Sequence, residues 1–378
     1  MRFSINRELF TKKLDAVDRV IPQNSPTTEL TGIFIQVFQD HIVLTGSDKT
    51  KSAQVILSPD EQNNLIIEET GSIVIKSSAL VALMRQFNGD TVQAESIDDA
   101  QIRFYGQNGD KFDLIGFAGS NYPHIDLSQP ASHLALPVRD LHTIYNQVGF
   151  ACATNTPRVY LTGINIRIQD HQLSATATDT ISMARKVLPV QTDAAMQVTL
   201  PKTALQTVTS LLNDEDQVDL YFDRKKMQFV SGDLMYQTTL LDGAYPDCDR
   251  LLKTKSKIDI ELNNKQFEAM ISRTTIYTAD KAAGSGVVPV LMEYGPDTIS
   301  VDVLNSTLGS CRQFMDDFSG ADYQGKIAFN GTIMLNALHA IRSAERITLH
   351  LGDDVTPIRI SVPSDPSIEM LLVPLRAY

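Results

Sequence analysis

The residues of this chain that are best suited to acid–base or metal chemistry are three runs of adjacent carboxylates. They are Asp214-Glu215-Asp216, Asp316-Asp317 and Asp353-Asp354. Each run lies in a segment that the pattern predicts to be a loop, and none has the ligand spacing of a calcium-binding EF-hand. Charge runs of this kind are usually solvated turns, so we expect no metal site here.

The histidines, glycines and cysteines offer no catalytic arrangement either. None of the seven histidines belongs to an HExxH or H-x-H pattern, and GxSxG is absent. Gly284-Ser285-Gly286 lacks the third glycine and the preceding strand of a dinucleotide-binding loop, which predicts a flexible loop. Cys152, Cys248 and Cys311 lie far apart without a CxxC pair, which favours reduced structural cysteines over disulfides or zinc ligands. The sequence therefore predicts a protein that is not an enzyme and has no cofactor.

The chain repeats itself. Residues 30–48 read LTGIFIQVFQDHIVLTGSD and residues 161–179 read LTGINIRIQDHQLSATATD, about 131 residues later. His41 and His171 are expected at the same place in both copies, the tip of a hairpin. A weaker third copy, VLMEYGPDTISVDVLN, begins at Val290, so three copies nearly fill the 378 residues. The sequence predicts one architectural unit used three times.

A shorter period lies inside the long one. Six times, an alternating strand ends on an apolar residue, and the first apolar residue of a helix follows five residues later. Each helix continues its apolar stripe at helical spacing, although the one from Phe267 is the least regular because Thr274 interrupts it. The six pairs are Ile5 and Phe10, Ile75 and Leu80, Leu136 and Leu141, Leu200 and Leu205, Leu262 and Phe267, and Phe329 and Met334.

Capping and turn residues mark the limits of these elements. Asn6, Ser77-Ser78 and Asn263-Asn264 are expected to cap three helices, and Pro201 is expected to open a fourth. The segments after each helix alternate between apolar and polar residues, which predicts strands. We therefore predict an α+β fold with antiparallel sheets. Turn residues separate the strands at Gln39-Asp40-His41, Asn88-Gly89-Asp90, Asn108-Gly109-Asp110, Gly295-Pro296-Asp297 and Gly352-Asp353-Asp354.

Two stretches without a hydrophobic period divide the chain. Residues 118–137 are rich in Ser, Pro and His, and residues 245–257 read YPDCDRLLKTKSK. Both connectors contain a Tyr-Pro pair near their start, Tyr122-Pro123 and Tyr245-Pro246, that an aspartate soon follows. We place the domain limits near 130 and 255, which gives domains 1–130, 131–255 and 256–378, each of ordinary size.

The distribution of charge points to a possible role for the helices. A net charge of −12 argues against a protein that coats nucleic acid through an overall positive field. The basic residues nevertheless gather on the predicted helices. Ordinary helices with a solvated face would explain this, but six related helices around one surface would make that surface basic where DNA passes. The helix cations expected to face DNA are Lys12, Lys13, Arg85, Lys202, Arg273 and Arg342.

No N-terminal apolar stretch resembles a signal peptide, and no apolar run approaches the length of a membrane span. We therefore expect a cytoplasmic protein that does not bind membranes.

Four segments, together with the repeat, carry a resemblance to a known family. They are MRFSINRELF at the N-terminus, ATD after the second LTGI hairpin, the connector AYPDCDRLL, and MLLVPLRAY at the C-terminus. Over its full length the chain resembles the bacterial DNA sliding clamps, the beta subunits of the replicative DNA polymerase III. The resemblance implies a non-catalytic processivity factor: a homodimeric, head-to-tail ring with helices inside and sheets outside. Such a ring encircles double-stranded DNA of any sequence and slides along it.

The resemblance also assigns contacts. Phe112 of the first domain is expected to face Ile276 and Tyr277 of the third domain in the other chain. The loop PQNSPTTEL after the first helix lacks the basic residue that the family often has there. The loop residues implied to face DNA are Asn24, Asn155, Arg158 and Tyr160.

A groove for short linear peptides of the replicative polymerase, the clamp loader and repair factors is implied as well. Apolar grooves with a polar rim suit hydrophobic peptide anchors. The family usually has a small residue, His and Arg after ATD, where this chain has Thr180-Ile181-Ser182. The loss of these donors predicts a shifted peptide preference. The implied groove residues are Leu161, Thr178, Thr180, Ile181, Ser182, Met183, Pro246, Arg250, Leu251, Val355, Pro357, Leu371, Val373, Pro374, Leu375 and Arg376.

Two other hypotheses remain open. A scaffold with the same repeats would bind peptides without DNA and would form no ring. A nucleic-acid-processing enzyme would show metal-dependent turnover of a DNA substrate. The repeat and the two terminal segments favour the clamp over both.

Overall fold

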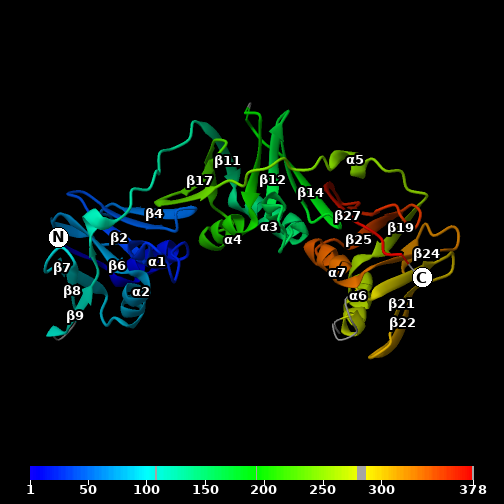
Figure 1. Ribbon diagram of the computed structural model, residues 1–378, viewed down its shortest axis with the longest axis horizontal. Coiled ribbons are helices and arrows are strands. Elements are labelled where there is room, and N and C mark those ends of the chain that lie inside the picture. The colour runs from blue at the N-terminus through cyan, green and yellow to red at the C-terminus, as the bar shows by residue number, and fades with distance from the viewer. Residues whose placement is uncertain (107–108, 193, 279–286, 377–378) are drawn as a thin grey trace. The chain divides into compact units, whose positions relative to one another are not determined.

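The computed structural model describes residues 1–106, 109–192, 194–278 and 287–376 (Figure 1). The predicted turn residue Asn108 and the segment Gly284-Ser285-Gly286 lie outside these ranges. The chain forms two compact units, one of residues 1–139 and 206–240 and the other of residues 140–205 and 241–378.

The first unit contains two antiparallel sheets. Its strands are β1 (Arg2–Asn6), β2 (Gly32–Val37), β3 (Ile42–Ser47), β4 (Lys51–Leu57), β5 (Ile66–Glu69), β6 (Gly71–Lys76), β7 (Thr91–Ser96), β8 (Gln101–Tyr105), β9 (Lys111–Ile115), β10 (Phe117–Ala118), β11 (Ser132–Pro137), β16 (Gln217–Phe222), β17 (Lys226–Ser231) and β18 (Leu234–Thr239). A five-stranded sheet has the order β5-β1-β7-β8-β9, and a nine-stranded sheet has the order β10-β6-β2-β3-β4-β18-β17-β16-β11. Helices α1 (Arg7–Asp18) and α2 (Ser77–Gln86) supply apolar side chains to one core with both sheets.

The second unit repeats this plan. Its strands are β12 (Gly163–Gln169), β13 (Gln172–Thr178), β14 (Ser182–Pro189), β15 (Met196–Pro201), β19 (Ile258–Asn263), β20 (Pro289–Tyr294), β21 (Ile299–Asn305), β22 (Gly309–Met315), β23 (Phe318–Ser319), β24 (Gly325–Asn330), β25 (Arg346–Leu351), β26 (Ile358–Val362) and β27 (Asp365–Leu372). A nine-stranded sheet has the order β15-β12-β13-β14-β27-β26-β25-β19-β23, and a four-stranded sheet has the order β22-β21-β20-β24. Helices α5 (Asp249–Leu252), α6 (Asn264–Thr278) and α7 (Gly331–Ala340) belong to this unit, as do the short 3-10 turns η4 (Gly149–Ala151) and η5 (Val159–Thr162).

Helices α3 (Val138–Val148) and α4 (Lys202–Leu211) each span a limit between the two units. The 3-10 turns η1 (Thr28–Thr31) and η3 (Gly119–Asn121) belong to the first unit.

The two large sheets cross the predicted domain limits. Strand β4 pairs with β18, and β14 pairs with β27, both antiparallel. Each predicted domain therefore shares a continuous sheet with the next one along the chain. Antiparallel α+β architecture is confirmed, and the sheet continuity is a feature that the sequence pattern did not predict.

All six predicted helices are present, and their irregularities have local causes. The apolar stripe of α6 accommodates Thr274 because its buried hydroxyl donates to the Ile271 carbonyl at 2.6 Å. The Asn6 side chain caps α1 by accepting from the Leu9 amide at 3.0 Å, as predicted. One expected start signal was wrong: Ser77 lies inside α2, where its hydroxyl donates to Asp18. Pro201 ends β15 and directly precedes α4, the helix that it was expected to open.

The long repeat is confirmed in the register of the hairpins. Ile35 pairs with Leu44 in the first hairpin, and Ile166 pairs with Ala175 in the second, with both partners 131 residues later. By this register the counterpart of His171 is residue 40, so the expected equivalence of His41 and His171 was wrong by one position. His171 has a positive φ of 58° in the two-residue turn between Gln169 and Gln172. His41 instead lies just after the equivalent turn, where its carbonyl accepts from the Phe38 amide at 2.9 Å.

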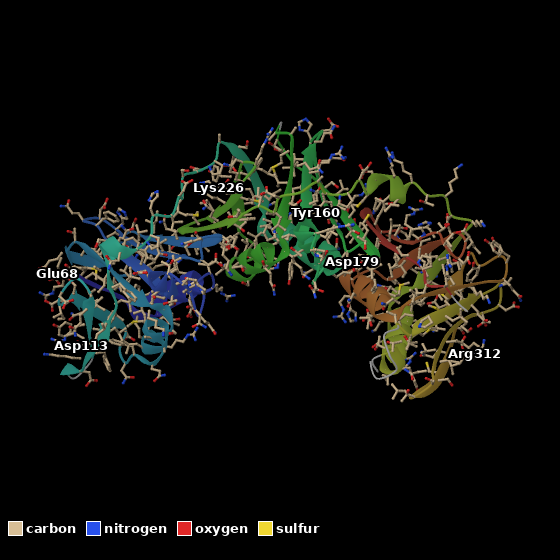
Figure 2. All side chains as sticks on the ribbon, in the orientation of Figure 1. Glu68, Asp113, Tyr160, Asp179, Lys226 and Arg312 are labelled. Carbon is tan, nitrogen blue, oxygen red and sulfur yellow. The ribbon has the colours of Figure 1, made fainter. Side chains whose placement is uncertain are left out.

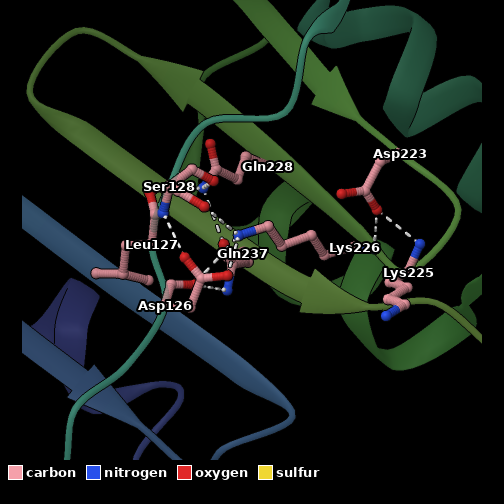
Figure 3. A network of polar contacts seen from close by, with 8 residues as sticks. All are labelled: Asp126, Leu127, Ser128, Asp223, Lys225, Lys226, Gln228 and Gln237. Carbon is pink, nitrogen blue, oxygen red and sulfur yellow. Dashed lines mark hydrogen bonds and ion pairs between the residues drawn. The ribbon is translucent and has the colours of Figure 1, made fainter.

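Side chains of β17 and β18 hold the connector at the end of the first predicted domain (Figure 3). Lys226 Nζ lies 3.0 Å from Asp126 Oδ2 and donates to Ser128 Oγ at 3.1 Å. Gln228 donates to the Leu127 carbonyl at 3.1 Å, and Gln237 donates to the Asp126 carbonyl at 3.0 Å. Hydrogen bonding from Ser128 and the Lys226 ammonium holds the pKa of Asp126 well below its usual range. The connector is therefore fixed to the sheet by polar contacts.

Candidate peptide groove and helix face

The second unit brings together four segments that carry most of the implied groove residues. In the pairing of β14 with β27, Met183 lies opposite Leu371. The Val373 amide extends this pairing by donating to the Ile181 carbonyl at 2.9 Å. The Thr178 amide donates to the Tyr245 hydroxyl at 2.9 Å, which attaches the second connector to the turn before β14. The fourth segment, residues 355–357, leads into β26, which is next to β27 in the sheet.

A buried apolar cluster forms the floor of this region. Met183 and Leu371 pack with Cys248 and Leu252, which α5 and the residue before it supply. Burial raises the pKa of the Cys248 thiol to about 11, so it remains protonated and apolar at neutral pH. Around this cluster the apolar side chains of four implied groove residues are exposed to solvent: Ile181, Leu251, Val355 and Val373. An exposed apolar rim over a buried apolar floor suits the binding of apolar side chains.

A chain of ion pairs fixes α5 to the sheet. Asp249 pairs with Arg167 at 3.2 Å and with Arg185 at 3.1 Å. Arg185 also pairs with Glu369 at 2.6 Å, and Arg359 reaches the same carboxylate at 3.2 Å. Asp249 follows Tyr245 by four residues, as Asp126 follows Tyr122 in the first connector. Both connectors therefore use an aspartate at the same place to bind cations of the sheet below.

The turn at residues 178–182 is closed by its own polar groups. Asp179 Oδ1 accepts from the Ser182 amide at 2.6 Å, and the Thr178 hydroxyl donates to the Ser182 carbonyl at 2.6 Å. Ser182 is buried, whereas Thr180 and Ile181 are exposed. Of the three altered residues, only Thr180 and Ile181 thus lie on the rim, and Ile181 makes that part of it apolar.

Other implied groove residues differ in their accessibility. Leu161 and Pro374 are buried, and the Leu375 amide donates to the Ala328 carbonyl at 2.7 Å. The remaining members are exposed or partly exposed: Pro246, Arg250, Pro357 and Arg376.

The structure adds residues that the resemblance did not assign. Tyr245, Cys248 and Leu252 belong to the floor or its support, and the Tyr-Pro connector was the available signal for them. Tyr160, implied to face DNA, packs edge-on against Tyr245 with ring centres 6.3 Å apart (labelled in Figure 2). Its surroundings are therefore those of the second connector.

The helices are less acidic than the chain as a whole. The six long helices contain eight lysines and arginines against five carboxylates, whereas the chain has 33 against 45. Lys12, Arg85, Arg273 and Arg342 are exposed, and Lys202 is half-buried. The loop residues Asn24, Asn155 and Arg158 are also exposed.

Several of these cations have a partner nearby. Lys13 pairs with Asp233 at 2.6 Å, and Arg85 pairs with Asp15 at 2.8 Å. Arg273 donates to Gln313. The predicted positive helix face is therefore weakened by local counter-charges, which the sequence pattern did not reveal.

The residues implied to form a dimer contact lie near two sheet edges. Phe112 is on β9, the last strand of its sheet, and packs against Phe87 with ring centres 5.6 Å apart. Ile276 is an exposed residue of α6, and Tyr277 is partly buried. Helix α6 packs on β21 and β22, and β22 is the last strand of the four-stranded sheet.

Among the described residues, no group of three His, Cys, Asp or Glu side chains is arranged to hold a metal ion. Within the same ranges, no helix is both long and apolar enough to span a membrane.

Comparison with known proteins assigns the family. Profiles of the DNA polymerase III beta subunit match its N-terminal domain to residues 1–126, its central domain to residues 135–247 and its C-terminal domain to residues 249–376. Relatives named beta sliding clamp from Staphylococcus epidermidis and Staphylococcus aureus are each 27% identical, with both chains fully covered.

Solved structures agree with the sequence comparisons. The beta subunit of the Streptococcus pyogenes DNA polymerase is 25% identical with a TM-score of 0.93, and all of both chains align. The sliding clamp of Bacillus subtilis has the same fold, with a TM-score of 0.93 at 24% identity and full coverage of both chains. The chain belongs to the DNA polymerase III beta subunit family, the bacterial sliding clamps.

Proposed function

We propose that two copies of this chain close head to tail into a ring around duplex DNA. The observation that supports closure most directly is the pair of sheet edges at β9 and β22, each of which has one neighbouring strand among the residues that the structure describes. Both strands carry an exposed large apolar residue, Ile115 on β9 and Phe314 on β22. Because an unpaired edge can accept a strand from another chain, β9 of one copy can pair with β22 of the next. Phe112 would then face Ile276 and Tyr277 of the second copy.

In this ring each chain contributes three domains, which we place at residues 1–130, 131–255 and 256–378. The helices line the hole and carry Lys12, Lys202 and Arg273 as well as the paired cations Lys13 and Arg85; the paired Arg342 lies just beyond α7. Loop residues Asn24, Asn155 and Arg158 would add contacts to the DNA backbone. Tight phosphate binding is not required because the closed ring cannot leave the duplex sideways, and weak contacts of any sequence allow it to slide.

The ring would act as a non-catalytic processivity factor in the cytoplasm. Its apolar groove would bind short linear peptides of the replicative polymerase, the clamp loader and repair factors. The rim at Ile181, Leu251, Val355 and Val373 supports this role because exposed apolar side chains can bury the apolar anchors of a peptide. The polymerase would thereby stay attached to DNA while it copies.

A single substitution tests the closure of the ring. In the free chain Ile276 is 65% exposed, so Ile276→Asp should leave the fold of one chain intact. If Ile276 is buried between two copies, the carboxylate should break the dimer because burying an unpaired charge is costly. Analytical ultracentrifugation should show single chains at concentrations where the wild type sediments as two.

The matched control is Ile66→Asp, because Ile66 is 61% exposed and lies on β5, the opposite edge of the sheet that contains β9. This variant should remain a dimer. A dimeric Ile276→Asp variant, or equal dissociation of both variants, would contradict the proposed interface.

A further inference from the structure

A groove on the helix face of the second unit lies where α3 and η4 meet α7. Its volume is about 500 Å³. Neutral amides line much of it, from Asn146 and Gln147 on one side and Asn336 on the other. His339 and Arg342, at the end of α7 and just beyond it, complete the lining. The groove is thus rich in hydrogen-bond donors and contains little formal charge.

A single carboxylate of α6 faces both basic residues of the groove. Glu268 Oε1 lies 3.3 Å from His339 Nε2 and 3.5 Å from Arg342 Nη2. The Glu268 side chain is only 18% exposed, whereas that of Arg342 is 71% exposed. The carboxylate is therefore mostly buried beside the arginine, whereas the guanidinium is exposed to solvent and can bind a second partner.

Amides and guanidinium groups both bind phosphate oxygens, but they differ in their response to salt. A lysine or arginine that neutralises a phosphate releases a counterion, which makes affinity fall with added salt, whereas an amide contact does not. A nearby carboxylate competes with phosphate for the same arginine. A groove of neutral donors with one compensated arginine is therefore suited to brief, weak phosphate contacts.

We propose that this groove receives backbone phosphates of the encircled duplex, and that Glu268 prevents Arg342 from holding them tightly. The proposal rests on the proposed function, in which this helix face surrounds DNA. Arg85 and Asp15, 2.8 Å apart, form the same kind of pair on helices of the first unit. The carboxylates of the helix face would then keep the ring mobile, because each competes with the DNA phosphates for its arginine and so weakens the contact between that arginine and the DNA.

The test compares Glu268→Gln with the wild type in binding to a fluorescent 30-base-pair duplex across a series of salt concentrations. Glu268→Gln should bind about two- to fivefold more tightly, the range expected when one exposed ion pair is removed. Its plot of log affinity against log salt should be steeper by about 0.9, the value for one additional neutralised phosphate. Glu61→Gln makes the same charge change in an exposed turn and should bind like the wild type.

Two further variants separate the arginine from the amides. Arg342→Gln should make the salt dependence shallower, and in that background Glu268→Gln should no longer raise affinity. Asn146→Ala with Asn336→Ala should weaken binding without changing the salt slope, because both lost contacts are neutral. Both asparagines are exposed, so these changes should not disturb the fold.

The proposal is overturned if Glu268→Gln and Glu61→Gln bind DNA equally, or if the gain persists without Arg342. It is also overturned if the paired asparagine variant binds DNA like the wild type. The mass of each variant, measured in the same buffers, reports whether two-chain rings are present. Failure of ring closure would therefore be distinguishable from failure of the groove.

Discussion

Thr180 adopts a backbone conformation that a threonine rarely adopts. Its φ is 80°, and Lys49, its counterpart 131 residues earlier, has a φ of 76°. A β-branched side chain is strained in this region, at a cost of about 1–3 kcal/mol. The turn is nevertheless closed by two hydrogen bonds: Asp179 accepts from the Ser182 amide, and the Thr178 hydroxyl donates to the Ser182 carbonyl, so the rest of the structure holds Thr180 in place.

Replacing Thr180 by glycine should therefore not destabilise the protein. Relief of strain should outweigh or balance the flexibility that glycine gives to the unfolded chain, about 0.5–1 kcal/mol. Calorimetry should show an unfolding temperature equal to or above that of the wild type. Thr176→Gly, in the paired part of β13, should lower it. A larger loss at residue 180 than at residue 176 would show that the turn is not strained.

Leu251 offers a cleaner test of the groove than Leu161 does. Leu161 is buried, so an aspartate there would disturb the fold itself, whereas Leu251 is 47% exposed. If the side chain is a binding hot spot, Leu251→Asp should weaken the binding of a labelled peptide from the partner polymerase by about 2 kcal/mol, roughly 30-fold in affinity. Fluorescence anisotropy measures this change.

The control for the groove is Leu304→Asp, another exposed leucine, on β21 of the four-stranded sheet. It should leave peptide affinity unchanged. Equal peptide affinity of Leu251→Asp and the wild type would remove Leu251 from the groove.

At the scale of elements, the first connector should respond to acid. The pKa of Asp126 is lowered by Ser128 and Lys226, and an unfolded aspartate has a pKa of about 3.9. A lowered pKa in the folded state contributes stability above the unfolded pKa, and this contribution is lost as pH falls through the folded value. The connector should therefore be held firmly from neutral pH to about pH 4 and less firmly below it.

Asp126→Asn removes this response. Calorimetry should find its unfolding temperature below that of the wild type at pH 7, with a difference that is constant down to about pH 4.5 and then shrinks. Asp242→Asn controls for the loss of one exposed charge. A difference that grows on acidification would mean that Asp126 does not stabilise the connector as a carboxylate.

The elements that sequence predicted well are those with local causes. All six long helices follow from apolar spacing within ten to fifteen residues. The Asn6 cap accepts its hydrogen bond from an amide only three residues away. Ser77 was mistaken for a cap because its partner, Asp18, is 59 residues away. Helix α5 was missed because four residues are too few to show a period.

Contacts between distant residues account for most of what the sequence could not predict. The ion pair of Lys13 with Asp233 spans 220 residues, and the pairing of β4 with β18 joins strands of different predicted domains. The apolar spacing of one strand fixes its buried face but does not identify its neighbour. The groove floor was therefore implied only by the resemblance, and Cys248 and Leu252 emerged only from the structure.

At the scale of the molecule, the net charge of −12 and a role on DNA are compatible. The helices contain more basic than acidic residues, and several of their cations are paired with carboxylates. A ring does not need strong attraction to DNA because closure retains it. The acidic remainder of the surface would limit non-specific binding to nucleic acid outside the hole.

Negative-stain electron microscopy, with a mass from the same preparation, shows directly whether two chains close into a ring. We expect particles of two 41.8-kDa chains with a central hole wide enough for duplex DNA. Single-chain particles, or two-chain particles without a hole, at concentrations where sliding clamps are dimeric would contradict it. That result would favour a peptide-binding scaffold that does not encircle DNA.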